Sequence, residues 1–226
     1  TRMTEPATPA SADRLALADW RRRVADLYAE VRRTARSDPR AAWERWRTTR
    51  EALFRDHPES PVPAPQRAGF EARHWPYDEA LRFVLPVLDE PTQVGGGIRL
   101  SLAPGERLQL PMSVGDALDF RRIGWLDVPF PAGARRLALY WMAGYSGGLF
   151  LPFRDATNGE ATYGAGRYLL DTAKSADLGA DSSGRLVVDF NFAFHPSCAF
   201  DPVWSCPLAP PENRLDLPIE AGERLR

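Results

Sequence analysis

The first part of the chain carries a hydrophobic pattern with the period of an α-helix. From Asp13 onward, apolar side chains recur every three or four residues, which places them on one stripe of a helix. These positions are Leu17, Trp20, Val24, Leu27, Tyr28 and Val31. The opposite side is charged, with bases and acids interleaved, so we interpret it as a solvated face.

A second helix is expected after Asp38-Pro39, because Asp suits the N-cap and Pro the first helical position. It should end near Asp56, just before another proline. The two predicted helices form a segment over residues 13–57. Trp43 and Trp46 are interpreted as anchors that dock the second helix on a sheet. The alternative is that both are exposed and serve a protein-interaction module.

The rest of the chain changes period. Residues 1–12 are rich in Thr, Pro, Ala and Ser and are predicted to be disordered, and residues 58–76 form a proline-rich, extended linker. From residue 77 to residue 226, short apolar runs are separated by Gly, Pro and Asp, which is typical of β-strands. The runs are 81–88, 98–102, 108–112, 118–123, 125–128, 136–142, 149–153, 185–194 and 217–219.

These strands are too evenly spaced for alternating βαβ units. The predicted fold class is therefore α+β, mainly β: an antiparallel sandwich or a partly open barrel with two N-terminal helices packed outside. Residues 136–142 and 149–153 are joined by a Gly-containing turn, and they make the clearest hairpin.

The run 185–194 alternates, so Phe190, Phe192 and Phe194 should face the core together. Asp189 and Asn191 would then share the other face, and His195 would continue that row if the strand runs so far. Polar side chains on an inner strand need partners, and two arginines, Arg154 and Arg167, are the candidates. Such a set is either a buried structural ion pair or a site for a planar anion.

The candidate ligand-binding residues cluster in the last third of the chain. They are Arg154, Asp155, Tyr163, Arg167, Tyr168, Asp189, Asn191, His195, Asn213 and Arg214. Residues 155–159 form a tight loop, and Asn213-Arg214 is expected to tie the proline-rich strap 207–211 back onto it. The leading hypothesis is a small-molecule-binding β-domain whose ligand has an anionic or hydrogen-bonding head group.

Three side chains near the end of this region allow other chemistry. His195, Cys198 and Cys206 could hold zinc, although their spacing matches no double CxxC pattern. The cysteines could equally form a local disulfide, remain buried thiols, or include a reactive thiol. An enzyme, either a hydrolase or a metal-assisted lyase using Asp189, His195 and Cys198, is the rival function. No cofactor is predicted, with zinc as the alternative.

Two long motifs carry a family resemblance: PFRDATNGEATYGAGRYL, and DFNFAFHPSCAFDPVWSCPLAPPENRL after a short spacer. They resemble the signature of a bacterial family known as domain of unknown function 1684. A weaker match upstream extends the resemblance to residues 43–222. The family often has Asn where this chain has His195, which argues against an essential imidazole. The resemblance implies no activity.

Charge and hydropathy narrow the range of partners. The net charge is −1, and the 28 Arg and one Lys are spread among 30 acidic residues, so we expect no nucleic-acid partner. No apolar run approaches the ~20 residues that span a bilayer, and no charged-then-apolar signal segment opens the chain. We therefore expect a cytoplasmic protein with no membrane span. The sequence leaves the oligomeric state and the identity of the ligand open.

Overall fold

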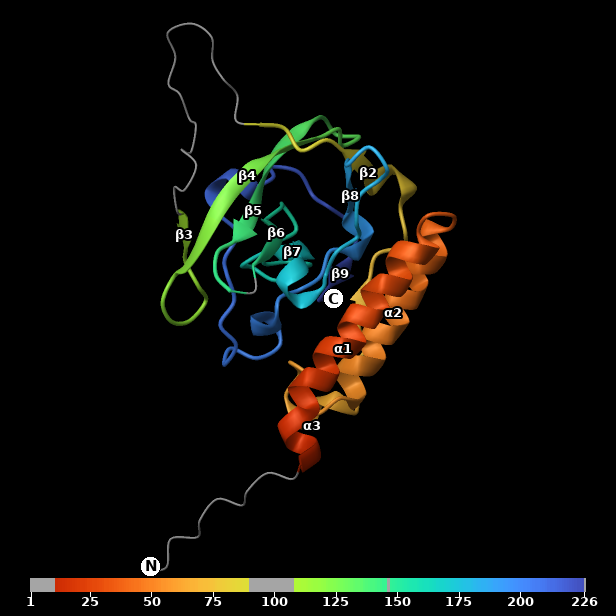
Figure 1. Cartoon of the computed structure of the whole chain (residues 1–226), viewed down its shortest axis with the longest axis vertical. Helices are drawn as coiled ribbons and strands as arrows, with labels where there is room; N and C mark the ends of the chain where they lie inside the picture. The colour runs from red at the N-terminus through yellow and green to blue at the C-terminus, as the bar shows by residue number, and fades with distance from the viewer. Residues whose placement is uncertain (1–10, 90–107, 146, 226) are drawn as a thin grey trace, which may run out of the picture.

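Two long helices lie side by side along one flank of a β-rich body (Figure 1). The computed structural model describes residues 11–89, 108–145 and 147–225. The predicted strand 98–102 and most of the segment predicted to be disordered lie outside these ranges. The first helix already begins at Ser11, so the last two residues of that segment are helical instead.

The helices are α1 (Ser11–Thr34) and α2 (Pro39–Asp56). The Asp38 side chain accepts a hydrogen bond of 2.9 Å from the amide of Ala41, which confirms the predicted cap. Trp43 and Trp46 are 7% and 0% exposed, so both are buried anchors. The interaction-module reading needed both side chains exposed, and it is wrong for that reason.

The largest sheet has five antiparallel strands in the order β3-β4-β5-β6-β7. The strands are β3 (Leu108–Leu110), β4 (Leu118–Val128), β5 (Arg135–Met142), β6 (Gly148–Phe153) and β7 (Arg167–Asp171). The β5–β6 hairpin is confirmed. The runs 118–123 and 125–128 are one strand with an irregularity beside Gly124. A Cβ on Gly124 would lie 2.7 Å from the Leu88 carbonyl oxygen, so this close approach requires glycine.

Two smaller antiparallel sheets complete the body. β2 (Arg82–Leu85) pairs with β8 (Leu186–Asp189), and β1 (Arg73–His74) pairs with β9 (Glu223–Arg224). Isolated bridges between Leu88 and Trp125 and between Tyr168 and Phe194 connect the chain around β2 and β8 to the five-stranded sheet. No sheet among the described residues closes on itself. The predicted fold class, mainly β with the N-terminal helices packed outside, is confirmed.

Several predicted details are wrong. The proline-rich linker contains a short helix, α3 (Ala64–Arg67), as well as β1, so it is not uniformly extended. The last strand is β9 and not 217–219, and the prediction missed β7. Short 3-10 helices also occur at Glu79–Leu81, Thr172–Lys174, Phe190–Phe192, Ser197–Ala199 and Pro211–Asn213.

The strand predicted over 185–194 stops at Asp189. The Asp189 side chain accepts a hydrogen bond of 3.0 Å from the amide of Asn191, and a 3-10 turn follows. This turn ends the alternation, so the phenylalanines do not share one face. Phe190 packs in a cluster inside the β-body, whereas Phe192 and Phe194 pack in the cluster that includes Trp46 of α2.

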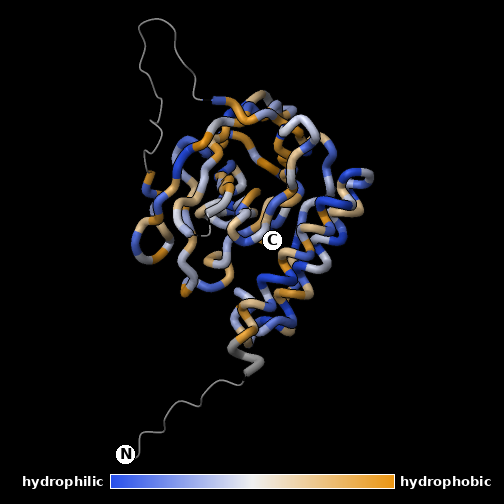
Figure 2. The backbone as a smooth tube through the Cα atoms, viewed as in Figure 1, coloured by the Kyte–Doolittle hydropathy of each residue, from blue (hydrophilic) through white to orange (hydrophobic). Residues whose placement is uncertain are grey.

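The hydropathy of the chain agrees with this arrangement. Hydrophilic and hydrophobic segments alternate along α1 and α2, and hydrophobic segments recur along the strands (Figure 2). In the part of the chain that the structure describes, no helix is long and apolar enough to cross a membrane. The helix pair therefore buries one apolar stripe against the body and keeps a charged side outside.

Candidate functional site

A cavity of about 400 Å³ lies between the helix pair and the β-body. Its volume falls in the range of small-molecule sites, which is about 300–1,000 Å³. The apolar part of its wall is formed by Leu17, Trp20, Val24, Tyr28, Phe54, Pro61, Tyr168, Ala176, Phe194, Pro196 and Trp204. The charged or titratable part includes Arg21, Arg50, Glu59, Asp171, Lys174, His195 and Cys206. A wall that combines large apolar and aromatic side chains with polar groups is the composition expected of a ligand site.

Arg50 forms part of the wall from α2. Its Nε donates a hydrogen bond of 2.5 Å to Glu223 Oε1, and Nη2 lies 3.3 Å from Oε2. The guanidinium also lies over the rings of Phe54 and Phe194, 4.1 and 5.0 Å from their centroids. Burial alone would raise the pKa of Glu223, but the attraction and hydrogen bonds to Arg50, together with the nearby His195 and His74, outweigh it and lower this pKa to about 2. A charged pair therefore connects the helix pair to β9.

His195 lies beside this pair and is 3% exposed. The amide of Tyr163 donates a hydrogen bond of 3.3 Å to Nε2, and Nδ1 lies 3.7 Å from Glu223 Oε2. Because Nε2 accepts, the proton of the neutral ring is on Nδ1, facing the carboxylate. Burial is the main reason that the pKa of His195 falls to about 4, so the ring is neutral at physiological pH.

Asp171 ends β7 and is 3% exposed. Its Oδ2 lies 3.4 Å from the Lys174 ammonium, which the following 3-10 turn brings back toward it. Its Oδ1 is also buried and has no hydrogen-bond partner among the described residues. Unpaired polar atoms are uncommon in protein interiors, and this oxygen is covered so completely that a molecule in the cavity cannot reach it without a local rearrangement.

The two cysteines are free and buried. The amide of Cys198 donates to Cys206 Sγ at 3.4 Å, and a hydrogen bond to Cys206 lowers the pKa of the Cys198 thiol. Of the alternatives in the sequence, the structure has buried thiols and no disulfide. No group of three or more His, Cys, Asp or Glu within residues 11–89, 108–145 and 147–225 is placed to hold a metal ion.

The sequence predicted that Arg167 would bind a ligand, but its side chain does not line the cavity. It is fully buried, and its Nη2 lies 2.7 Å from Asp155 Oδ2. Its remaining hydrogen bonds go to the carbonyls of Ile219, Ala221 and Glu223, at 2.8, 2.5 and 3.1 Å. The buried Asp–Arg pair thus exists, but its acid is Asp155, and the guanidinium holds the C-terminal segment.

Asp189 has other partners than the predicted arginines. Its Oδ2 accepts from the Tyr77 hydroxyl at 3.1 Å and lies 3.6 Å from Arg82 Nε. Asn191 donates to Asp189 Oδ1 at 2.8 Å and exchanges two hydrogen bonds of 2.8 Å with the backbone of Asp78. Burial raises the pKa of Asp189 to about 6. None of these contacts involves His195, so the two residues lack the direct contact that the rival enzyme hypothesis would use.

Asn213 and Arg214 attach the proline-rich strap 207–211 in different ways, one through its side chain and the other through its backbone. The Asn213 side chain accepts from the Ala138 amide at 2.7 Å and donates to the carbonyls of Ala138 and Pro152 at 2.9 and 2.7 Å. The backbone of Arg154 bridges to that of Arg214, whose side chain is exposed. The strap therefore returns to the segment beside the 155–159 loop, as predicted, through amides and not through guanidinium contacts.

Of the ten predicted ligand-binding residues, Tyr168 and His195 line the cavity. The prediction missed Tyr28 and Arg50 because both belong to helices that the sequence assigned only to packing. It missed Asp171 and Lys174 because β7 was not recognised. Their signal was present, since an acid and the single lysine lie three residues apart after an apolar run.

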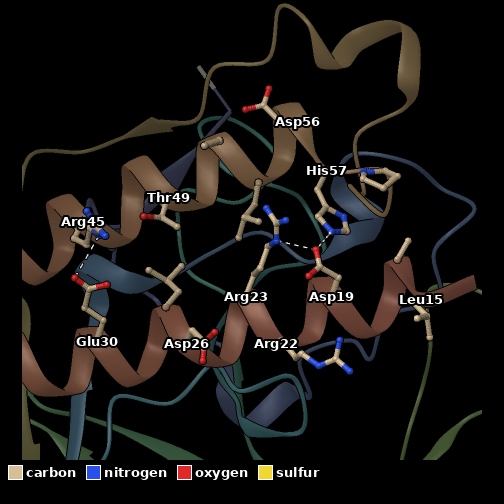
Figure 3. Close-up of a pocket in the computed structure, with 15 residues that line it drawn as sticks. Leu15, Asp19, Arg22, Arg23, Asp26, Glu30, Arg45, Thr49, Asp56 and His57 are labelled. Atoms are coloured by element: carbon tan, nitrogen blue, oxygen red, sulfur yellow. Dashed lines mark hydrogen bonds and ion pairs between the residues drawn. The ribbon is translucent and has the colours of Figure 1, made fainter. Parts of the chain in front are cut away.

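A larger groove of about 780 Å³ lies between α1 and α2, and Figure 3 shows its charged walls. Several of its charges are paired with each other: Asp19 lies 2.7 Å from Arg23 and 3.2 Å from His57, and Glu30 lies 3.5 Å from Arg45. Most of these side chains are exposed to solvent, where such pairs contribute little. The cavity between the helix pair and the β-body, with more aromatic side chains in its wall, is therefore the stronger candidate site.

Comparisons with known proteins support the fold and assign no activity. The model of a family described as "Protein of unknown function (DUF1684)" matches residues 73–224. No curated protein matches the chain. The chain is similar to an uncharacterized protein of Haloarcula marismortui solved by NMR in solution, with 27% sequence identity and a TM-score of 0.54. That alignment covers 79% of this chain and 89% of the other.

Proposed function

The chain belongs to the DUF1684 family of proteins of unknown function, and from this premise we propose that it binds a small molecule in the cavity between α1, α2 and the β-body. The observation that carries the proposal is a cavity of about 400 Å³ whose wall combines six aromatic side chains with charged groups from both the helices and the β-body. Such a wall offers a large apolar contact area together with polar groups that can fix the orientation of a ligand.

The helix pair supplies one wall, so the cavity depends on how the helices dock. Arg50 connects α2 to Glu223, and Arg21 Nη1 donates a hydrogen bond of 3.0 Å from α1 to the carbonyl of Ala173. These contacts hold the helices at the rim and leave the apolar side chains between them to face a ligand. A ligand that displaces water from such a wall gains hydrophobic free energy in proportion to the apolar area buried.

The test fills the cavity from the helix side. Val24 lines it and is partly buried, so Val24→Trp is expected to occupy the space of a ligand. Ala29→Trp adds an even larger increment of side chain at an exposed position of the same helix and is the matched control. Compounds from a small-molecule library that raise the melting temperature of the unmodified protein should also raise that of the Ala29 variant but not that of the Val24 variant.

Binding can also be followed directly, because Trp20 and Trp204 line the cavity and their fluorescence should change when a ligand enters. Isothermal titration of the best compounds against the three proteins then gives the affinities. If every stabilising compound acts equally on the Val24 variant, ligands bind elsewhere and the proposal is wrong. If no compound in a chemically diverse library stabilises the unmodified protein, the proposal also fails.

A further inference from the structure

We propose that Cys198 and Cys206 are a redox-active dithiol, which hydrogen peroxide oxidises reversibly to a disulfide. The proposal goes beyond ligand binding in the cavity and does not depend on it. It rests on the contact between the two cysteines, on the hydrogen-bond donors around one of them, and on the thin layer of chain that separates the pair from solvent.

The two cysteines are in contact in the folded chain. Both are free and buried, and Cys206 Sγ accepts a hydrogen bond of 3.4 Å from the amide of Cys198. The two side chains also interact with each other, because a hydrogen bond to Cys206 is the main cause of the lowered pKa of Cys198. A disulfide needs side chains that already approach each other, and the sequence contains no third cysteine that could compete.

The surroundings of Cys198 stabilise its thiolate. The side chains of Cys206, Ser113 and Tyr163 each form a hydrogen bond with it, and together they lower its pKa although burial acts in the opposite direction. The pKa of Cys206 is raised, first by the same hydrogen bond and then by burial, so this thiol keeps its proton. The thiolate is the nucleophilic form, so Cys198 is the attacking sulfur and Cys206 the second one.

The oxidation proceeds in two steps. The Cys198 thiolate attacks one oxygen of hydrogen peroxide, the O–O bond breaks, and hydroxide leaves with a proton from solvent as water. The sulfur of Cys206 then attacks the sulfenic acid formed at Cys198, so that an S–S bond forms and the S–O bond breaks. The hydroxyl group leaves with the thiol proton of Cys206 as a second water. The two sulfurs lose two electrons in total, and the peroxide gains them.

Only a thin layer of chain covers the pair. Residues 202–205, directly before Cys206, are all exposed. Ser113, which contacts Cys198, is partly exposed, and its hydroxyl donates a hydrogen bond of 3.1 Å to the carbonyl of Trp204 at the surface. A surface segment that is held by exposed hydrogen bonds opens locally at low cost, which is enough to admit a molecule as small as hydrogen peroxide.

The disulfide would close a ring over residues 198–206. This ring contains Phe200, whose centroid lies 5.2 Å from that of Phe54 at the end of α2. It also contains Trp204, whose Nε1 donates a hydrogen bond of 3.3 Å to the carbonyl of Pro61. Oxidation therefore restrains the loop that holds the end of α2 and the segment after it. A cross-link over a ring of this size should raise the melting temperature by about 5–10 °C.

The test counts free thiols after treatment of the folded protein. The protein is incubated with a small excess of hydrogen peroxide at pH 7, catalase removes the excess, and N-ethylmaleimide is added in denaturant. Both cysteines lie in one tryptic peptide, residues 186–214. The reduced protein takes up two labels, whereas the oxidised protein should take up none and this peptide should be lighter by two hydrogens. Dithiothreitol should restore both labels and lower the melting temperature again.

Two variants assign the roles of the sulfurs. In Cys206→Ser, peroxide should leave a sulfenic acid at Cys198 that dimedone traps. Cys198→Ser is the matched control, and its remaining thiol should react at least about threefold more slowly, because it is not held as a thiolate. An equal or faster reaction in this control would show that the attacking sulfur is assigned wrongly.

Two results would overturn the dithiol itself. One is retention of both labels under conditions that fully oxidise glutathione, and the other is a disulfide that joins two chains. The labelling of the unmodified protein decides the proposal even if a variant does not fold. A disulfide that forms without raising the melting temperature would contradict the restraint of the loop, and ligand binding in the cavity is tested separately by Val24→Trp.

Discussion

Replacing His195 with asparagine should remove a specific part of the pH dependence of stability. In the folded protein this imidazole is buried and its pKa is about 4, against an ordinary value of 6.5. Below pH 6.5 this residue is therefore protonated in the unfolded chain, whereas it stays neutral in the folded chain until the pH approaches 4. Its contribution to the free energy of unfolding is complete above pH 6.5 and is lost as the pH falls toward 4.

The magnitude follows from the two pKa values. Each pH unit within this window is equivalent to about 1.4 kcal/mol, so two units below 6.5 the loss approaches about 2.5 kcal/mol. Asparagine has no proton to bind, and although its shorter side chain does not reach the position of Nε2 that accepts from the Tyr163 amide, the loss of that hydrogen bond does not depend on pH and cancels in the comparison. The variant should therefore lose about 2.5 kcal/mol less than the unmodified protein when the pH falls from about 7 to about 4.5.

The assay is urea unfolding followed by tryptophan fluorescence at both pH values, with the two proteins compared as a difference of differences. Other titrating groups cancel in this comparison, including Asp189, whose raised pKa acts in the opposite direction in the same window. An NMR titration of the ring C–H signals, with the His195 signal identified by its loss in the variant, measures the pKa directly. Parallel pH profiles for the two proteins, or an imidazole that titrates near 6.5, would refute the reasoning.

Two further predictions concern stability. Arg167→Met leaves the buried Asp155 carboxylate without its counter-ion and three backbone carbonyls without their donor, so the free energy of unfolding should fall by about 3–5 kcal/mol. Urea unfolding measures this loss. A loss below about 1 kcal/mol would contradict the role of Arg167 in holding the C-terminal segment. Gly222→Ala places a Cβ against the carbonyl oxygen of Ala193 at a φ of +75°, and it should cost at least about 1–3 kcal/mol in the same assay. Gly159→Ala is the control, because its φ is +88° but no atom lies within 4 Å of the added Cβ, so equal losses in the two variants would show that strain alone is responsible.

The helices and most strands could be predicted because their signals are local. The Asp38-Pro39 start of α2 is encoded in neighbouring residues, and the β5–β6 hairpin has alternating runs on either side of a glycine turn. The error at 185–194 has the opposite cause. Whether Asp189 continues a strand or caps a 3-10 turn depends on Tyr77 and Arg82, which contact it from more than 100 residues earlier in the chain. The residues around Asp189 contain no signal of these distant contacts.

The candidate site was harder to predict than the fold for a related reason. The sequence indicated that Arg167 would partner a buried acid, but it assigned that acid as Asp189, whereas the structure pairs Arg167 with Asp155. The cavity is formed where two helices meet the body, so its wall combines Tyr28 and Arg50 with Asp171 and His195. Residues this far apart carry no shared spacing, and each one alone has an ordinary explanation as a packing or surface residue.

The ion pair between Arg50 and Glu223 joins residues that are 173 positions apart, and this has a consequence for biosynthesis. At a translation rate of about 5–20 residues per second, the helix pair leaves the ribosome some ten to thirty seconds before its carboxylate partner exists. During that interval, the apolar stripe of α1 and α2 has no body to dock on. The ion pair that connects α2 to β9 can therefore form only after translation has reached β9.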